Sequence, residues 1–124
     1  MIRLRGFTLM ELLITLTIIA LLVALATPRY FRSVDRSRDV ILQENLRILR
    51  NTFDKFYEDK GRYPESLDEL VDERYLREVP RDPITEKADT WTIQQPPENL
   101  EGAVYDVHSS AEGVSSLGIP YAEM

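Results

Sequence analysis

The sequence has no cysteine among its 124 residues, so it can form neither a disulfide framework nor a thiolate metal site. It also has only one histidine and one tryptophan, and it contains no internal repeat and no glycine-rich phosphate loop. No nucleophile stands beside a base, and no pair of acids has a catalytic spacing. The net charge of −6 argues against nucleic-acid binding by the chain as a whole. These absences predict a protein that is not an enzyme and has no nucleic-acid partner.

What the sequence does have is one membrane-length apolar segment near its start. Residues 7–27 carry a single charge, on Glu11. A helix over these residues would be about 31 Å long, close to the hydrocarbon thickness of a bilayer. A plain single-pass anchor explains this pattern. A cleaved secretory signal is the alternative, with Arg3 and Arg5 as its basic region and Ala24-Leu25-Ala26 as its cleavage pattern.

Glu11 is the most informative residue of this segment. A charge inside a hydrocarbon layer costs roughly 2.5–3.5 kcal/mol on insertion scales, so an acid there indicates a function. Thr15 follows at i+4 and is placed to donate to the Glu11 carboxylate, whereas Thr17 is expected to bond back to its own helix. Pro28 removes the hydrogen bond to the Ala24 carbonyl, which predicts a kinked or loosened helix at that point.

The residues around Glu11 form a motif that neither an anchor nor a secretory signal explains. A short basic leader, residues 1–6, ends in glycine and is followed by Phe-Thr-Leu-x-Glu, which places the motif on Gly6, Phe7, Thr8, Leu9 and Glu11. The segment resembles the type IV pilin and type II secretion pseudopilin superfamily. The resemblance implies that a membrane prepilin peptidase cuts after Gly6 and N-methylates Phe7.

The resemblance also implies a partner for Glu11. In that superfamily the glutamate neutralises the amino group of a neighbouring subunit as helices stack in a filament. Within one chain, Glu11 and the new amine of Phe7 would lie about 6 Å apart along the helix axis. A staggered neighbour would bring the two charges closer, in a medium where pairing offsets desolvation. Glu11 is therefore expected to be an assembly residue.

Beyond Pro28 the chain is predicted to stay helical as far as Lys60. An apolar stripe recurs at spacings of 4, 3, 4 and 3 residues, made by Leu42, Leu46, Leu49, Phe53 and Phe56. The stripe is short and holds two Phe, so we interpret it as one side of a domain core rather than a coiled-coil seam. Lys60-Gly61 is a typical helix end. The arginines of residues 29–38 are expected either to touch anionic headgroups or, preferably, to pair with acids on neighbouring subunits.

The remaining chain predicts a small domain with a short sheet. Ser66-x-x-Glu69 has the form of a capping box and opens a short helix. Residues 90–93 and 103–107 are the strand candidates, with a proline-containing loop between them. Gly61-Arg62-Tyr63-Pro64 and Pro80-Arg81-Asp82-Pro83 resemble turns of the major pseudopilins. The expected fold is α+β and pilin-like: a long N-terminal helix, membrane-spanning in its first half and amphipathic in its second, packed on a small antiparallel β-sheet.

The C-terminal loop, from Asp106 onward, raises the question of a metal. In major pseudopilins this region often winds around calcium, and calcium is a candidate cofactor here. However, Ca²⁺ takes 6–8 oxygen ligands, and the loop offers only Asp106, Glu112 and Glu123, widely spaced, with several serines. We therefore expect no cofactor and assign no metal ligand. His108, the single histidine, is interpreted as an exposed or hydrogen-bonded structural residue.

Together these features predict a leader at residues 1–6, a transmembrane and assembly helix at 7–28, and a periplasmic domain at 29–124. The resemblance implies a type II secretion pseudopilus subunit, a homo-oligomeric filament former anchored in the bacterial inner membrane. Its partners would be the prepilin peptidase, other pseudopilins and the inner-membrane secretion platform. A type IV or competence-type pilin is the alternative within the superfamily, and a non-polymerising membrane-anchored binding module is the alternative outside it. Counting arginines on both sides of the span does not predict its orientation.

Overall fold

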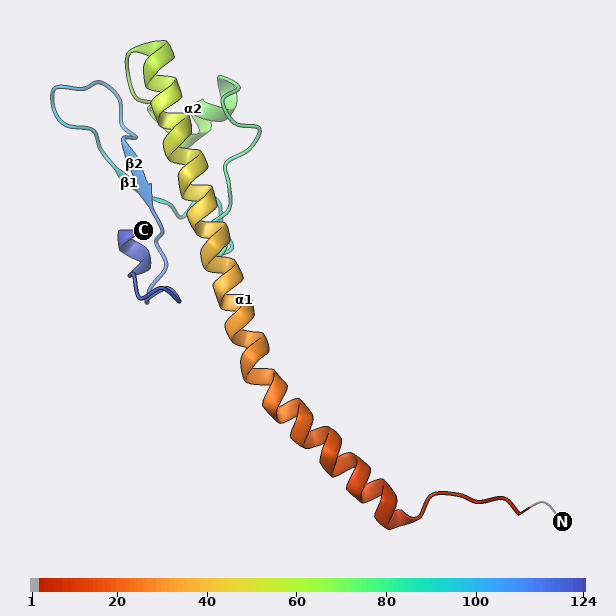
Figure 1. Ribbon diagram of the computed structural model, residues 1–124. Coiled ribbons are helices and arrows are strands. Elements are labelled where there is room, and N and C mark those ends of the chain that lie inside the picture. Colours follow the sequence, from red (N-terminus) through yellow and green to blue (C-terminus); the bar gives the residue numbers. More distant parts are fainter. Residues whose placement is uncertain (1–2) are drawn as a thin grey trace. The chain divides into compact units, whose positions relative to one another are not determined.

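The computed structural model describes residues 3–124, so the first two residues of the predicted leader lie outside it. By its internal contacts the chain divides into two units, residues 1–35 and residues 36–124, here called the N-terminal unit and the C-terminal unit. The element order is α1 (Leu9–Lys60), α2 (Leu67–Asp72), β1 (Thr92–Gln94), β2 (Asp106–His108) and a 3₁₀ turn, η1 (Tyr121–Glu123) (Figure 1). Helix α1 belongs to both units, and each unit is described by itself.

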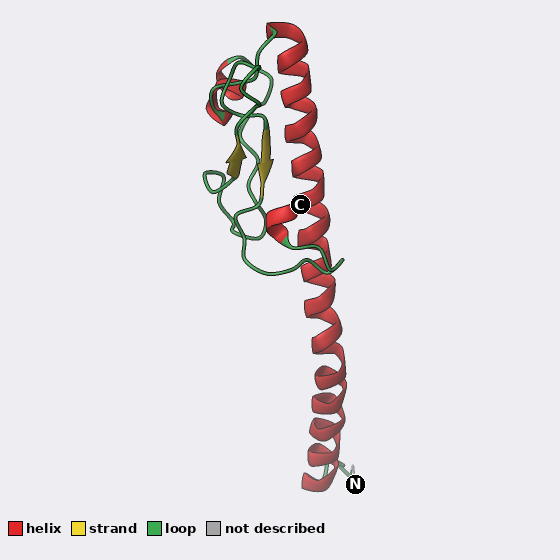
Figure 2. Cartoon of the chain, turned by 90° about the vertical axis from the view of Figure 1, so that its left-hand side faces the viewer, coloured by secondary structure: helices red, strands yellow, loops and turns green. Residues whose placement is uncertain are grey.

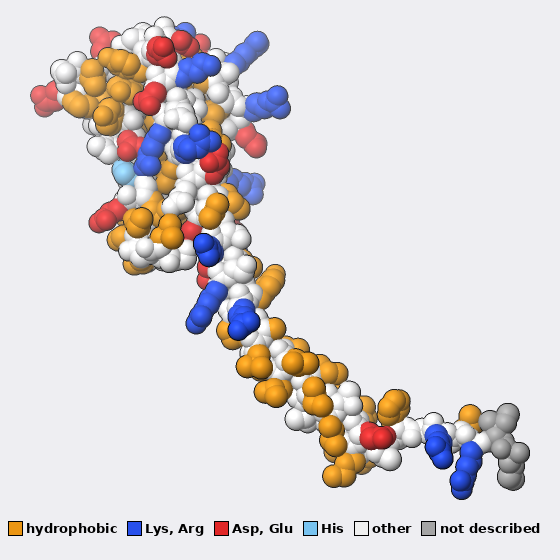
Figure 3. Space-filling model, in the orientation of Figure 1, with side chains coloured by type: hydrophobic (Ala, Val, Ile, Leu, Met, Phe, Trp, Pro, Cys, Tyr) orange, Lys and Arg blue, Asp and Glu red, His pale blue; other side chains and the backbone are white. Residues whose placement is uncertain are grey.

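The N-terminal unit contains the first part of α1, which is preceded by the non-helical residues 3–8. The helix begins at Leu9, two residues later than the expected start at Phe7, because Thr8 caps it. It continues without interruption past Pro28. Its large apolar side chains from Leu9 to Phe31 are all exposed, and Figure 3 shows hydrophobic side chains covering this stretch of the helix. By length and composition the helix can cross a membrane.

In the C-terminal unit the apolar stripe of α1 is buried, as the spacing predicts. Its five members are at most 2% exposed, and they are Leu42, Leu46, Leu49, Phe53 and Phe56. Leu70 of α2 and Trp91, Val104 and Val107 from the sheet region also belong to the core. The helix ends at Lys60, where Gly61 takes a φ of 72° and donates its amide to the Tyr57 carbonyl. The stripe is therefore one side of a domain core.

Helix α2 begins where the capping box places it. The Ser66 hydroxyl accepts the Glu69 amide at 3.2 Å. The Glu69 carboxylate accepts the Glu65 amide and also binds Arg62 at 2.6 Å. This cap buries Leu67 and Leu70 against the core.

The sheet has two antiparallel strands, with Ile93 opposite Val107 (Figure 2). Strand β1 begins two residues later than predicted and β2 three residues later, and each ends one residue later. For β2 the reason is that residues 103 and 104 donate their amides to the Pro64 carbonyl, and the Glu101 carbonyl accepts the Tyr63 amide. Gly102 permits this contact, since a Cβ there would lie 2.4 Å from the Tyr63 oxygen. A backbone pairing with the turn after α1 therefore takes the place of the first part of the predicted strand.

The architecture is α+β: a long N-terminal helix, apolar in its first part, with a small antiparallel sheet. In Figure 2 the sheet lies alongside the second part of α1, and the C-terminal turn η1 lies next to the same stretch. This confirms the predicted fold class.

Candidate functional site

The start of α1 is held by a reciprocal capping box. The Thr8 hydroxyl accepts the Glu11 amide at 3.1 Å, and the Glu11 carboxylate accepts the Thr8 amide at 2.9 Å. Two backbone donors that a helix start leaves unpaired are thereby satisfied. The pattern Thr-x-x-Glu before an apolar run is the signal for this cap. The same pattern predicted the cap at Ser66, whereas no cap was predicted at Thr8.

Glu11 therefore has a partner within its own chain. Its Oε2 is bound to the Thr8 amide, while no described residue donates a hydrogen bond to its Oε1, and no described cation pairs with it. A negative charge in the first turn is also favoured by the helix dipole. The carboxylate is thus oriented by the cap and keeps a free oxygen for a second partner.

Gly6 and Phe7 precede this cap in an exposed, non-helical segment. The Phe7 side chain is 92% exposed, and no atom lies within 4 Å of the position that a Cβ of Gly6 would occupy. The residues on both sides of this peptide bond are therefore exposed. Cleavage after Gly6 and methylation of Phe7 stay predictions that this geometry suits.

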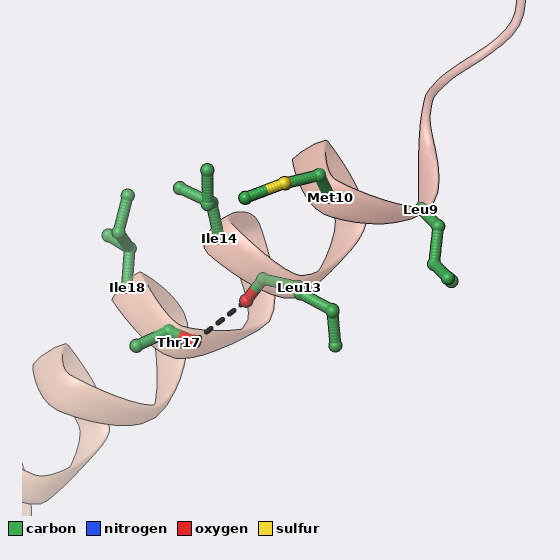
Figure 4. A pocket seen from close by; sticks show the side chains of 6 residues that line it. All are labelled: Leu9, Met10, Leu13, Ile14, Thr17 and Ile18. Atoms are coloured by element: carbon green, nitrogen blue, oxygen red, sulfur yellow. Dashed lines mark hydrogen bonds between the residues drawn. The ribbon is translucent and has the colours of Figure 1, made fainter.

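The threonines of the apolar segment all bond back to the helix. Thr15 donates to the Glu11 backbone carbonyl at 2.8 Å, so the expected bond to the Glu11 carboxylate is wrong. Thr17 donates to the Leu13 carbonyl, as predicted (Figure 4). Thr27 donates to the Val23 carbonyl. Each hydroxyl is therefore satisfied inside the helix, which leaves an apolar outer surface suited to lipid or to another helix.

Figure 4 shows that outer surface close to the cap. Leucine, isoleucine and methionine side chains project from successive turns and border a shallow apolar hollow, lined by Leu9, Met10, Leu13, Ile14, Thr17 and Ile18. The hollow begins within one turn of Glu11. It is a surface shaped for an apolar neighbour, with the single acid at its edge.

The C-terminal segment is tied to α1 by two side chains that the sequence analysis did not single out. Asp39, 2% exposed, accepts the Ser116 amide at 2.7 Å and the Tyr121 hydroxyl at 2.6 Å. Burial alone would raise the pKa of Asp39, but these hydrogen bonds outweigh it and hold the pKa below its usual range. Arg50 donates to Asp106 at 2.8 Å and to the Met124 carbonyl at 2.6 Å.

The donors considered for calcium do not converge. Asp106 is paired with Arg50 and with the Val107 amide. Glu112 and Glu123 are exposed, and no group of three or more metal-binding side chains occurs within residues 3–124. His108 lies 3.1 Å from the Met124 carbonyl, the hydrogen-bonded structural setting expected for it. The carboxylates of this loop therefore do not gather into a cluster, and the expectation that the chain holds no cofactor stays a prediction.

Comparison with known proteins gives two findings. Residues 1–27 match the family described as the prokaryotic N-terminal methylation motif. The chain is 37% identical over 68 residues to the type IV major pilin protein PilA of Myxococcus xanthus (strain DK1622), which covers 55% of this chain and 31% of that protein. The chain thus spans about a third of the length of this curated relative. No solved structure matches the chain.

Proposed function

We propose that this chain is a structural subunit of a type II secretion pseudopilus. The subunit is stored in the inner membrane as a precursor, cut after Gly6 by a prepilin peptidase, methylated at Phe7 and polymerised through its N-terminal helix. The observation that carries the proposal is the methylation motif joined to a capped helix whose first segment, residues 9–27, is exposed and apolar and has Glu11 as its single charge. The C-terminal unit would lie in the periplasm, where the filament supports protein export.

Assembly needs specific contacts rather than hydrophobicity alone. Lipid tails are as apolar as leucine, so moving a helix from lipid to a filament gains little from apolar burial. The side chains around the hollow of Figure 4 would provide shape complementarity between neighbouring helices. Glu11 would fix the position of one helix relative to the next, because a buried charge is stabilised only where a partner of opposite charge meets it.

The capping box gives this contact a starting geometry. The Thr8 amide orients one carboxylate oxygen of Glu11, and the second oxygen is available to the methylated amine of a neighbouring Phe7. N-methylation keeps the amine charged at neutral pH, so the ion pair survives the modification. Glu11 then serves two partners, its own helix start and the next subunit.

A type IV pilin is the second candidate, and the similarity to PilA favours it. The absence of cysteine favours the pseudopilin, since major type IV pilins commonly close their C-terminal region with a disulfide. Deleting the gene separates the two. If secreted proteins no longer reach the medium while surface fibres remain, the pseudopilus is supported. If the fibres disappear while secretion continues, the pilus is supported.

The first test is the intact mass and N-terminal residue of the protein from native membranes. A start at N-methylated Phe7 supports a filament subunit. A start at Met1 indicates a plain anchor, and a start at Thr27 indicates an ordinary secreted domain. Either of these two results overturns the proposal.

A further inference from the structure

The end of the apolar segment carries a second feature, made by four consecutive residues of α1. Arg29 and Arg32 flank Tyr30 and Phe31, and all four side chains are exposed. The two aromatic rings are 67% and 60% exposed and lie edge to face, with centroids 5.9 Å apart. We call residues 29–32 the exit collar. Nothing in the proposed assembly mechanism uses it.

The collar arginines have no acidic partner. Neither Arg29 nor Arg32 forms a salt bridge with any residue that the structure describes, although Asp35 follows Arg32 by one turn. Spaced three residues apart, the two guanidinium groups share one face of the helix, and Phe31 lies toward another. The collar therefore presents two unpaired cations beside two exposed aromatic rings.

The position of the collar matches the headgroup layer of a bilayer. With residues 12–27 in the hydrocarbon, residues 29–32 lie about 3–8 Å beyond its edge. Aromatic rings are enriched at this depth, and arginines there reach lipid phosphates. Because the collar directly follows the proposed membrane span, its two unpaired arginines would lie next to lipid headgroups.

The choice of arginine points to phosphate in particular. All eight basic residues up to Arg50 are arginine, and the first lysine is Lys55. Guanidinium groups bind phosphate oxygens through two parallel hydrogen bonds, which an ammonium group does not. Basic residues that flank a span help to orient it in the membrane, and two arginines after the span oppose the effect of Arg3 and Arg5 before it. Orientation therefore does not explain why arginines stand at positions 29 and 32.

We propose that the exit collar binds the phosphates of anionic phospholipids in the leaflet where the span ends, with Arg29 and Arg32 as the phosphate ligands. Tyr30 and Phe31 set the depth of the helix in that leaflet. The stored subunit is thereby held at a fixed height, and extraction into a filament exchanges these phosphate contacts for others. The inference rests on the proposed membrane span but not on polymerisation.

The test reconstitutes the full chain into bilayers that contain spin-labelled phosphatidylglycerol or phosphatidylcholine and compares how strongly each lipid associates with the protein. We expect a preference for phosphatidylglycerol that falls on the order of thirtyfold in the Arg29→Gln/Arg32→Gln variant at low salt, following about 1 kcal/mol for each of the two basic residues at an anionic surface. Arg29→Lys/Arg32→Lys should retain part of the preference. The control, Arg77→Gln/Arg81→Gln, removes the same charge from exposed positions outside the span and should change nothing.

Alkaline extraction of the same samples separates the two proposals. A wild-type chain that is extracted from the bilayer overturns the membrane span and the collar together. A chain that stays inserted but shows equal preference in wild type and Arg29→Gln/Arg32→Gln overturns the collar alone. A third outcome is that Arg29→Gln/Arg32→Gln loses cross-linking between copies in detergent micelles without lipid and keeps the lipid preference of wild type. That outcome would show that the two arginines pair with acids of a second copy, and it would also overturn the collar proposal.

Discussion

In the N-terminal unit the hydrogen bonds of Thr8, Glu11, Thr15 and Thr17 all join residues three or four positions apart. In the C-terminal unit Asp39 binds residues 77 and 82 positions away. The first unit is therefore specified by a short run of sequence and leaves its surface open to partners. The second is specified by contacts between distant segments and covers its own core. The functional features of the N-terminal unit can therefore be recognised from a short stretch of sequence, whereas the contacts that stabilise the C-terminal unit cannot.

The strongest way to break this contrast is to damage the core of the C-terminal unit. Phe53→Ala should lower its free energy of unfolding by about 3–5 kcal/mol, because the ring is 1% exposed and its loss leaves a cavity. Unfolding followed by the fluorescence of Trp91 measures this. Ile41→Ala, at a side chain 50% exposed, is the control and should change little. Membrane insertion of both variants should match wild type, and a failure of Phe53→Ala to insert would show that the units depend on each other.

Removing the buried carboxylate tests whether long-range polar contacts stabilise the second unit. Asp39→Ala leaves the Ser116 amide and the Tyr121 hydroxyl without their acceptor and should destabilise the unit by about 1–3 kcal/mol. Because the folded state lowers the pKa of Asp39, its contribution is complete above the unfolded value of 3.8 and is lost as the pH falls through the lower folded pKa. The wild-type protein should therefore lose its advantage over Asp39→Ala below about pH 4. Equal stability of the two proteins at pH 7 would contradict this.

The Glu11→Gln variant sharpens the contrast at the N-terminal unit. Glutamine also serves in a capping box, so the helix start should survive while the charge is lost. We expect insertion and processing as in wild type, with filament incorporation reduced at least about tenfold, equivalent to roughly 1.4 kcal/mol. Sedimentation of cross-linked filaments measures incorporation. Normal incorporation would remove Glu11 from the assembly mechanism.

The Thr8→Ala variant makes the opposite change, removing the cap hydroxyl and keeping the carboxylate. Loss of an N-cap side chain costs about 1 kcal/mol, so the first turn should fray in the isolated protein. Incorporation should fall less than in Glu11→Gln, since the charge is still present. Hydrogen exchange of the Glu11 and Leu12 amides reports the fraying. A larger assembly defect in Thr8→Ala than in Glu11→Gln would make the cap, and not the charge, the dominant contribution.

The sequence predicts the features that depend on nearby residues, and it does not predict those that depend on contacts between distant segments. The buried stripe of α1, the stop at Gly61 and the cap at Ser66 were predicted correctly, because each depends on a pattern of residues that are close together in the sequence. The strands were shifted, because the pairing of Ala103 and Val104 with Pro64 is set by distant segments. For the same reason Asp39 and Arg50 carried no local signal. Only the cap at Thr8 could have been found and was missed.

The capping box has one further consequence. Each of its donors and acceptors, on Thr8 and Glu11, lies on the C-terminal side of the bond between Gly6 and Phe7. Cleavage at that bond would remove no residue of the helix or of its cap and would leave the helix start as it is. The cut would then alter electrostatics without refolding anything, replacing a neutral peptide group by an ammonium group one residue before the cap. The helix start would have the same conformation in the precursor and in the processed chain, and only the charge next to it would differ. The protease would therefore act by changing charge rather than structure.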